Sequence, residues 1–511
     1  MEKPILRHAK SVEGMLGCID RCIFNGRIRN LEYPEGVERW LHRNEILKRD
    51  LGDFARVWWK RIKEGAKKAA EEGGRAFLSV SSDLRKEDRV RAIVEESGIT
   101  SGLACVLTAT EPIRSYRLLY GNFKQNLHLA KATRRGLVVY FYFLHQQLGL
   151  MHARIQAWLP FTIQIHVNGH SWLARKLQEQ GLPFEQRDNC FAKIGDIKAA
   201  ARIAEEFPAL DWVSLLDPIA RGVNPLLNGV LAQERYEWYV DQCEYSTDII
   251  FADPAELESF SREAIERGCL YLGAEDVMRF LGRRLNPQYQ GEVLTQVVKR
   301  WPGARIRHVA GSNCIKLYSK NGCALRLETV INWPYDFRVT RSTLRNGTTT
   351  VRRAPLVKSI DCFPLFQEVG RDCNERYLQA IEDVSPPGPA HAALLQLQDR
   401  LPGARNRRPL NPAATGDVAL FKSALAGENH LHGFRNADIR ARLFASPVAI
   451  DELRKQRRRV SRLLGLLRNR GLIDLIPRTR RWRVTEQGLR SMSAAIRCYE
   501  KDFPEAFSTA A

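Results

Sequence analysis

Alternation with a period of two residues marks the middle of the chain. Residues 151–158 and 161–167 each alternate apolar and polar side chains, and Leu159-Pro160 separates the two stretches. This period is typical of β-strands with one buried face. If the two strands are neighbours, one sheet face carries the polar set, which consists of His152, Arg154, Gln156, Gln164 and His166. Such a face suits a divalent metal or phosphate groups, and it equally suits simple exposure to solvent.

Residues 313–332, NCIKLYSKNGCALRLETVIN, predict a β-hairpin that turns near Asn321-Gly322. A two-residue loop at Asn321-Gly322 would mix polar and apolar side chains on both faces. A three-residue loop at 320–322 pairs Tyr318 with Ala324 and separates the faces, so we expect this register. The register gathers four polar side chains on one face, namely Lys316, Tyr318, Arg326 and Glu328.

The last hundred residues show helical periodicity. Val460, Leu463, Leu464 and Leu467 recur at the spacing of one helix face, and Gly471 is placed to end that helix. Two shorter helices are expected before it, and two strands around a basic turn at 477–480 and a final helix after it. The predicted order is therefore helix, helix, helix, hairpin, helix.

These patterns predict an α+β protein of several domains, with a central mixed or antiparallel sheet. We expect an N-terminal α/β region at 1–95, the central sheet domain at 96–340, an Arg/Pro-rich connection at 341–412 and the C-terminal domain at 413–500.

Charge narrows the range of partners. The chain has 79 Lys+Arg against 58 Asp+Glu, a net charge of +21, which favours a polyanion. Residues 401–511 contribute +12 of it. The eleven cysteines include no Cys-x-x-Cys, and no stretch reads as a signal peptide or a membrane span. We therefore expect a cytoplasmic protein with reduced thiols and no membrane partner.

The C-terminal stretch LLGLLRNRGLIDLIPRTRRWRVTEQG resembles the winged-helix domains of MarR-like regulators. The resemblance implies that the third helix enters the DNA major groove and that the hairpin contacts phosphate or the minor groove. Base edges would be read by Gln456, Arg457 or Ser461, and the remaining arginines would hold the backbone. The implied DNA-binding residues are Arg454, Gln456, Arg457, Arg458, Ser461, Arg462, Arg478, Arg480 and Arg481.

The hairpin at 313–332 suggests a second chemistry. A tyrosine among cationic side chains suits nucleophilic attack on a phosphodiester, so Tyr318 is the candidate nucleophile and Lys316, Lys320 and Arg326 are its candidate partners. Tyr-x-Lys followed by Leu-Arg-x-Glu resembles the corresponding strands of rolling-circle replication initiators. The resemblance implies a Mg²⁺ or Mn²⁺ site, with His152, His166, Asp248 and Glu328 as candidate ligands.

The whole chain also resembles a bacterial family whose members end in a winged helix. The leading hypothesis is a DNA-binding protein of mobile-element or replicon type that holds duplex DNA, and single-stranded DNA if it nicks. The alternatives are a non-enzymatic transcriptional regulator and an RNA-binding or RNA-processing protein. No Walker-type loop, dinucleotide-binding glycine motif or Gly-x-Ser-x-Gly is present in the sequence.

Overall fold

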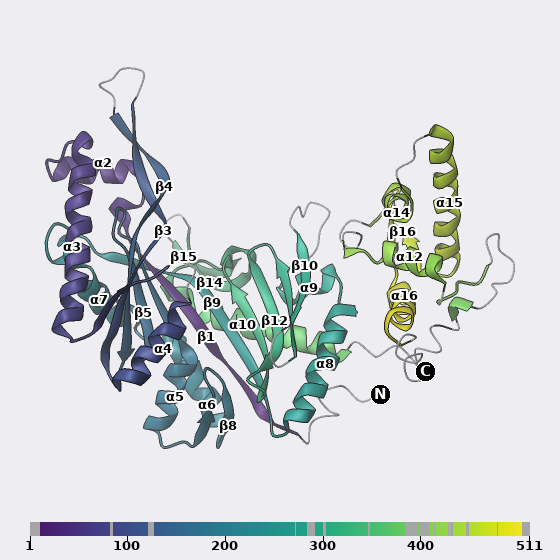
Figure 1. The fold of residues 1–511 in the computed structure, drawn as a ribbon, viewed down its shortest axis with the longest axis horizontal. Coiled ribbons are helices and arrows are strands. Elements are labelled where there is room, and N and C mark those ends of the chain that lie inside the picture. Colours follow the sequence, from purple (N-terminus) through teal and green to yellow (C-terminus); the bar gives the residue numbers. More distant parts are fainter. Residues whose placement is uncertain are drawn as a thin grey trace. The chain divides into compact units, whose positions relative to one another are not determined.

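The computed structural model describes residues 11–81, 85–120, 127–270, 272–283, 292–299, 303–345, 348–383, 394, 396–398, 408–412, 414–427, 429, 433–445, 449–477 and 479–502. The chain forms two compact units. The first, which we call the sheet unit, consists of residues 12–252 and 320–372. The second contains residues 253–319 and the chain from 373 onward. Figure 1 shows the helices and strands of both units.

The sheet unit is built on eight strands in the order β13-β9-β1-β6-β5-β4-β3-β2. Their bounds are β1 Val12–Ile28, β2 Ala76–Ser79, β3 Gly102–Tyr120, β4 Leu127–His145, β5 Gly149–Gln156, β6 Ile163–Asn168, β9 Tyr236–Phe251 and β13 Ala324–Ile331. All pairs are antiparallel except β2 with β3. The N-terminal strand β1 lies in the middle of this sheet, so residues 1–95 are not the separate region that we predicted.

Helices cover the sheet of this unit. They are α2 Pro34–Arg43, α3 Leu51–Glu72, α4 Lys86–Ser97, α5 Gly169–Glu179, α6 Ile197–Glu206, α7 Trp212–Val223 and the start of α10 Phe363–Asp383. Phe24 of β1 packs against Trp212 of α7 and Phe363 of α10, with ring centroids 4.5 and 5.3 Å away. These apolar rings anchor one face of β1, while Cys18, Asp20 and Arg21 belong to the polar side that holds the candidate site.

The predicted neighbours β5 and β6 do pair. His152 lies opposite His166, and Arg154 lies opposite Gln164, so these polar side chains share one face as expected. A small sheet of β7 Phe184–Gln186 and β8 Phe191–Ile194 lies between α5 and α6 in the sequence. A further two-stranded sheet consists of β14 Arg338–Arg345 and β15 Thr348–Pro355.

The second unit contains β10 Val293–Lys299, β11 Ala304–Ala310 and β12 Asn313–Lys320, with helices α8 Pro254–Leu270 and α9 Ala274–Phe280. Only Lys320, the last residue of β12, belongs to the sheet unit. His308 of β11 is buried and lies 2.8 Å from the hydroxyl of Tyr377 in α10. The Phe280 ring packs on Tyr377 with the centroids 4.9 Å apart. Helix α10 therefore belongs to packed cores, although we predicted a connection over 341–412.

The C-terminal domain has the predicted order of elements. Its helices are α12 Thr415–Ala424, α14 Asn436–Leu443, α15 Ile450–Asn469 and α16 Glu486–Arg497, and its hairpin is β16 Ile473–Leu475 with β17 Trp482–Val484. Val460, Leu464 and Leu467 are buried in one cluster with Phe421, Ile439 and Met492. The α+β fold class, with a sheet domain and a C-terminal helical domain bearing a hairpin, is as predicted.

The turn between β12 and β13 differs from the register that we preferred. The amide of Cys323 donates to the carbonyl of Lys320 at 3.1 Å. Asn321 and Gly322 both have positive φ, 52° and 69°. This is the two-residue hairpin turn that suits Asn-Gly. The preference of Asn-Gly for a two-residue turn therefore outweighed the separation of polar and apolar side chains, on which our prediction relied. Among the described residues, no helix is long and apolar enough to cross a membrane.

Candidate functional site

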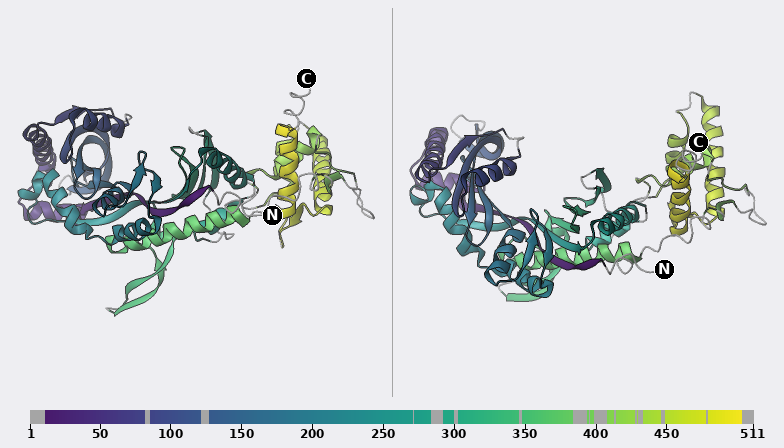
Figure 2. Two further views of the ribbon diagram at one scale, coloured as in Figure 1. Left: turned by 90° about the horizontal axis from the view of Figure 1, so that it is seen from below. Right: turned by 60° about the horizontal axis from the view of Figure 1, so that its bottom comes forward.

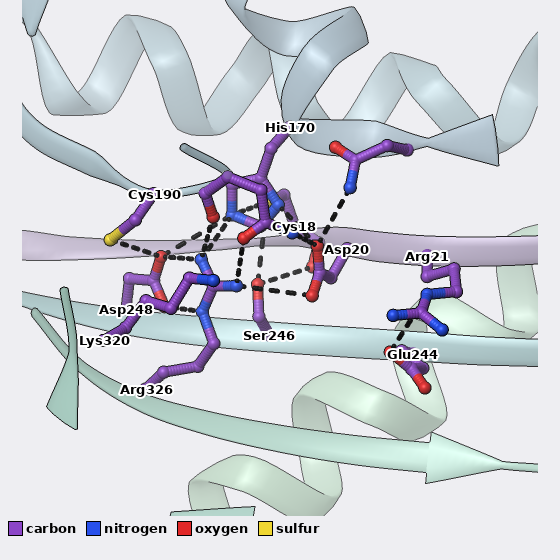
Figure 3. Close-up of polar contacts among 12 residues, drawn as sticks. Cys18, Asp20, Arg21, His170, Cys190, Glu244, Ser246, Asp248, Lys320 and Arg326 are labelled. Atoms are coloured by element: carbon purple, nitrogen blue, oxygen red, sulfur yellow. Dashed lines mark hydrogen bonds and ion pairs between the residues drawn. The ribbon is translucent and has the colours of Figure 1, made fainter. Parts of the chain in front are cut away.

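The site begins at an irregularity in β1. Ile19 pairs with Tyr245 of β9, whereas Arg21 pairs with Glu244, so Asp20 is the additional residue of a β-bulge. Bulges redirect side chains and often occur beside functional sites. The Asp20 side chain is 6% exposed and lies on the same side as Cys18, Ser246 and Asp248 (Figure 3). The bulge thus brings a carboxylate into a buried polar cluster.

Arg326 of β13 is the centre of this cluster. Its side chain is fully buried and donates two hydrogen bonds to Asp248, from Nε to Oδ1 and from Nη2 to Oδ2, both at 2.7 Å. Its Nη1 donates to Asp20 Oδ2 at 3.3 Å and to Asn189 Oδ1 at 2.9 Å. Its Nη2 also donates to the Asn189 carbonyl at 2.7 Å. The guanidinium therefore ties β13, β9, β1 and the loop before β8 together.

His170 completes the cluster from the start of α5. Asn168 caps this helix by accepting from the Ser171 amide at 2.9 Å. The imidazole Nδ1 lies 3.1 Å from Asp20 Oδ1, and Nε2 lies 3.4 Å from Cys18 Sγ and 3.5 Å from Asp248 Oδ2. Burial opposes charge on the ring, but the Cys18 sulfur and the two carboxylates raise the pKa of His170 well above its usual value.

The electrostatics of this cluster are those of a compensated ionic network. Burial would raise the pKa of Asp20 and Asp248, but the Arg326 charge and the hydrogen bonds of His170 hold both pKa values below the usual range. Two carboxylates thus face one guanidinium and one imidazole, whose Nε2 also lies 3.1 Å from Arg326 Nη2. All four side chains are at most 6% exposed. Such a network fixes the positions of strands rather than meeting a large substrate directly.

An acidic group adjoins this network. Asp20, Glu244 and Glu328 each offer an oxygen atom, and these atoms all lie within 4.8 Å of one another. All three residues are buried. Arg21 Nε lies 3.7 Å from Glu244 Oε2, and the Arg21 side chain is 49% exposed. Carboxylate oxygens are the ligands that Mg²⁺ and Mn²⁺ prefer, so the donor set fits such an ion.

The predicted metal ligands do not form one site. The rings of His152 and His166 stack with centroids 4.1 Å apart on β5 and β6. Burial lowers the pKa of His166 to about 3, helped by the charges of Arg21 and Arg154. Asp248 is engaged by Arg326, and only Glu328 belongs to the acidic group. The predicted four-residue ligand set is therefore divided among three places.

The predicted nucleophile and its partners are largely enclosed. Tyr318 is 4% exposed and pairs with Arg305 of β11, and Lys316 pairs with Arg307. Lys320 lies 3.3 Å from Asp188 in an ion pair, and Arg326 is held as described above. The two-residue turn also contradicts the register that would have gathered these side chains on one face.

The predicted DNA-binding residues are mostly accessible. Arg454, Arg457, Arg458, Ser461 and Arg462 are exposed on α15, and Arg480 is exposed beside β17. Arg481 is half-buried and donates to the Gly433 carbonyl at 3.2 Å. Gln456 is 8% exposed and donates to the Ala445 carbonyl at 3.3 Å, so our expectation that it is exposed to read bases is wrong. Arg478 lies outside the described residues.

Sequence reasoning missed Asp20, His170 and Glu244. The one local signal was a pair of adjacent charged residues, Asp20 and Arg21, inside an otherwise apolar strand, in LGCIDRCIF. The convergence itself depends on the bulge and on pairing between segments up to 306 residues apart. No family model, curated protein or solved structure matches the chain.

Proposed function

We propose that this protein binds duplex DNA through the C-terminal domain, with α15 in the major groove and the β16–β17 hairpin against the backbone. The supporting observation is the two-sided character of α15. Val460, Leu464 and Leu467 fill the core of the domain, while Arg454, Arg457, Arg458 and Arg462 are exposed. A helix with an apolar anchor and a row of exposed cations has the size and charge to enter the major groove.

Affinity measurements with the full chain test this proposal. Arg457→Ser/Arg458→Ser/Arg462→Ser should weaken binding to a labelled duplex by at least tenfold, because three cationic contacts to an anionic surface are lost. Lys422→Ser/Arg490→Ser is the matched control, since these cations lie on α12 and α16 and already pair with Glu500 and Glu486. Equal affinities of the triple variant and wild type would refute the proposal. Preference for single-stranded RNA over duplex would favour the RNA alternative.

A second candidate function is supported by the acidic group of the sheet unit. We propose that Asp20, Glu244 and Glu328 hold Mg²⁺ or Mn²⁺ for cleavage of a phosphodiester. A bound ion would polarise the phosphate and stabilise its developing charge. Arg21, half-exposed beside Glu244, would hold a nonbridging oxygen of the same phosphate.

Cleavage assays separate this mechanism from tyrosine attack. Glu244→Gln and Glu328→Gln should abolish metal-dependent cleavage of DNA and weaken Mn²⁺ binding, whereas Tyr318→Phe should leave both unchanged. A covalent protein–DNA adduct that disappears in Tyr318→Phe would restore the tyrosine mechanism. If the protein binds duplex without cleaving it in either metal, the regulator alternative holds.

A further inference from the structure

The β14–β15 ribbon is a separate element of the sheet unit. Figure 2 (left) shows it extending away from the other elements of its unit as a two-stranded arm. Its base is fixed, because Phe337 and Leu356 are buried and the Leu356 amide donates to the Phe337 carbonyl at 2.8 Å. Beyond the base, most described side chains are exposed on both strands. The ribbon therefore contributes little to the core of its unit.

Charge on the ribbon has one sign. Residues 338–355 include five arginines and no aspartate or glutamate. Arg341 and Arg352 lie directly opposite each other, an arrangement that costs free energy when both residues are charged. Arg341 Nε donates to the Pro355 carbonyl at 2.8 Å, and Arg352 Nε donates to Thr343 Oγ1 at 2.9 Å. These acceptors are uncharged, so the hydrogen bonds orient the two cations without neutralising them.

Apolar side chains accompany the arginines. Leu344 is 75% exposed and Val351 is 71% exposed. The register places Leu344 opposite Thr349 and Ser342 opposite Val351, so the two apolar side chains are diagonal neighbours on one face. Large apolar groups presented on a charged, projecting element are typical of an interaction surface.

We propose that this ribbon is a second contact for duplex DNA, separate from α15 and located in the other unit. Two strands lie about 4.8 Å apart, and the B-form major groove, about 12 Å wide, admits such a ribbon. Leu344 and Val351 lie on one face of the ribbon and contact the apolar parts of base edges. The register places Arg341 and Arg352 on the other face, from which their long side chains contact phosphates at the rims of the groove. The major groove of A-form RNA is too narrow for this fit. The inference extends the proposed DNA binding to a site that can be tested independently of it.

The test uses the full chain and a labelled duplex of arbitrary sequence. Arg341→Ser/Arg352→Ser should lower affinity about tenfold, as expected for the loss of two charge contacts, one from half-buried Arg341 and one from exposed Arg352. It should also reduce the slope of log affinity against log salt by about two. Arg341→Lys/Arg352→Lys, which keeps both charges, should restore most of the affinity. Lys198→Ser/Arg202→Ser removes two exposed cations from α6 and should change nothing.

Several outcomes overturn the inference. Unchanged affinity and salt slope in Arg341→Ser/Arg352→Ser, with unchanged thermal unfolding, would exclude the ribbon as a DNA contact. An equal loss of binding to duplex RNA of the same sequence, or to anionic lipid vesicles, would identify a general anion surface instead. Unchanged duplex affinity in the α15 variant alone would refute the proposed function and leave the ribbon contact supported. Unchanged duplex affinity in the ribbon variant alone would refute the ribbon contact and leave the proposed function supported.

Discussion

Arg326 and Asp248 meet through two hydrogen bonds of 2.7 Å, and both side chains are fully buried. They are directly opposite each other in the register of β13 and β9. Backbone pairing therefore positions the two residues, and a bidentate interaction with two donors and two acceptors holds their side chains together. Removing either partner leaves a buried charge without its nearest counter-ion, and only the longer contacts of Arg326 with Asp20 or of Asp248 with His170 remain.

Single replacements at this pair should be costly. Arg326→Met is expected to lower the free energy of unfolding by about 3–5 kcal/mol, because Asp248 would keep a buried negative charge. Arg326→Met/Asp248→Leu should cost less than the sum of the single changes. Urea unfolding followed by tryptophan fluorescence provides the comparison. Strict additivity of the two changes would show that the ion pair carries no coupling.

Stability should depend on pH through the stacked histidines. The folded pKa of His166 is about 3, and burial also lowers that of His152 well below its usual value. The two neutral rings therefore contribute fully to the free energy of unfolding above about pH 6.5. This contribution is lost as the pH falls toward 3, by up to about 1.4 kcal/mol per pH unit for each ring. His170, whose pKa is raised, acts in the opposite sense and loses its contribution only as the pH rises above its usual value.

His152→Gln/His166→Gln should flatten this profile. Unfolding free energies measured between neutral pH and pH 4.5 would fall less steeply in the variant than in wild type. Loss of the Asp20 and Asp248 contributions begins only below the ordinary aspartate pKa, since both folded pKa values are lowered, so it does not obscure the histidine effect. Parallel profiles would contradict the assignment of neutral rings.

The start of α5 should tolerate no side chain at Gly169. A Cβ there would lie 2.0 Å from the Ile19 carbonyl oxygen, so Gly169→Ala must push the helix away from β1 and displace His170. We expect a loss of about 1–3 kcal/mol. Gly52→Ala is the control, because a Cβ at Gly52 meets nothing within 4 Å and the change favours α3. Thermal unfolding of both variants decides whether the close approach matters.

Gln456 and Arg457 should separate stability from DNA binding. Gln456→Ala removes a hydrogen bond to the Ala445 carbonyl and should destabilise the protein by about 1 kcal/mol without changing affinity per folded molecule. Arg457→Ala should leave unfolding unchanged and weaken DNA binding. Circular dichroism and fluorescence anisotropy on the same preparations make the comparison. A loss of affinity in Gln456→Ala alone would reverse these roles.

Local periodicity predicted the elements that depend on it. The pairing of His152 with His166 followed from alternation, and α15 and the β16–β17 hairpin followed from helical spacing and a glycine stop. The site at Asp20 could not be predicted in this way. Its members come from β1, α5, β9 and β13, and a bulge that no residue pattern announced shifts their register.

Composition misled the interpretation of residues 341–412. Arginine and proline suggested a connection, yet the structure places a paired ribbon at 338–355 and a helix with a buried face at 363–383. The Asn-Gly turn after Lys320 was misassigned in a similar way. The local turn preference determines its register, whereas we had predicted the register from the separation of polar and apolar side chains onto two faces.

The salt dependence of duplex binding decides whether α15 is the DNA-binding helix. For wild type, log affinity should fall linearly with log salt, and the slope should decrease by about three in Arg457→Ser/Arg458→Ser/Arg462→Ser, one unit for each lost phosphate contact. The control Lys422→Ser/Arg490→Ser should keep the wild-type slope. Identical slopes for wild type and the triple variant would contradict the assignment of α15 as the DNA-binding helix.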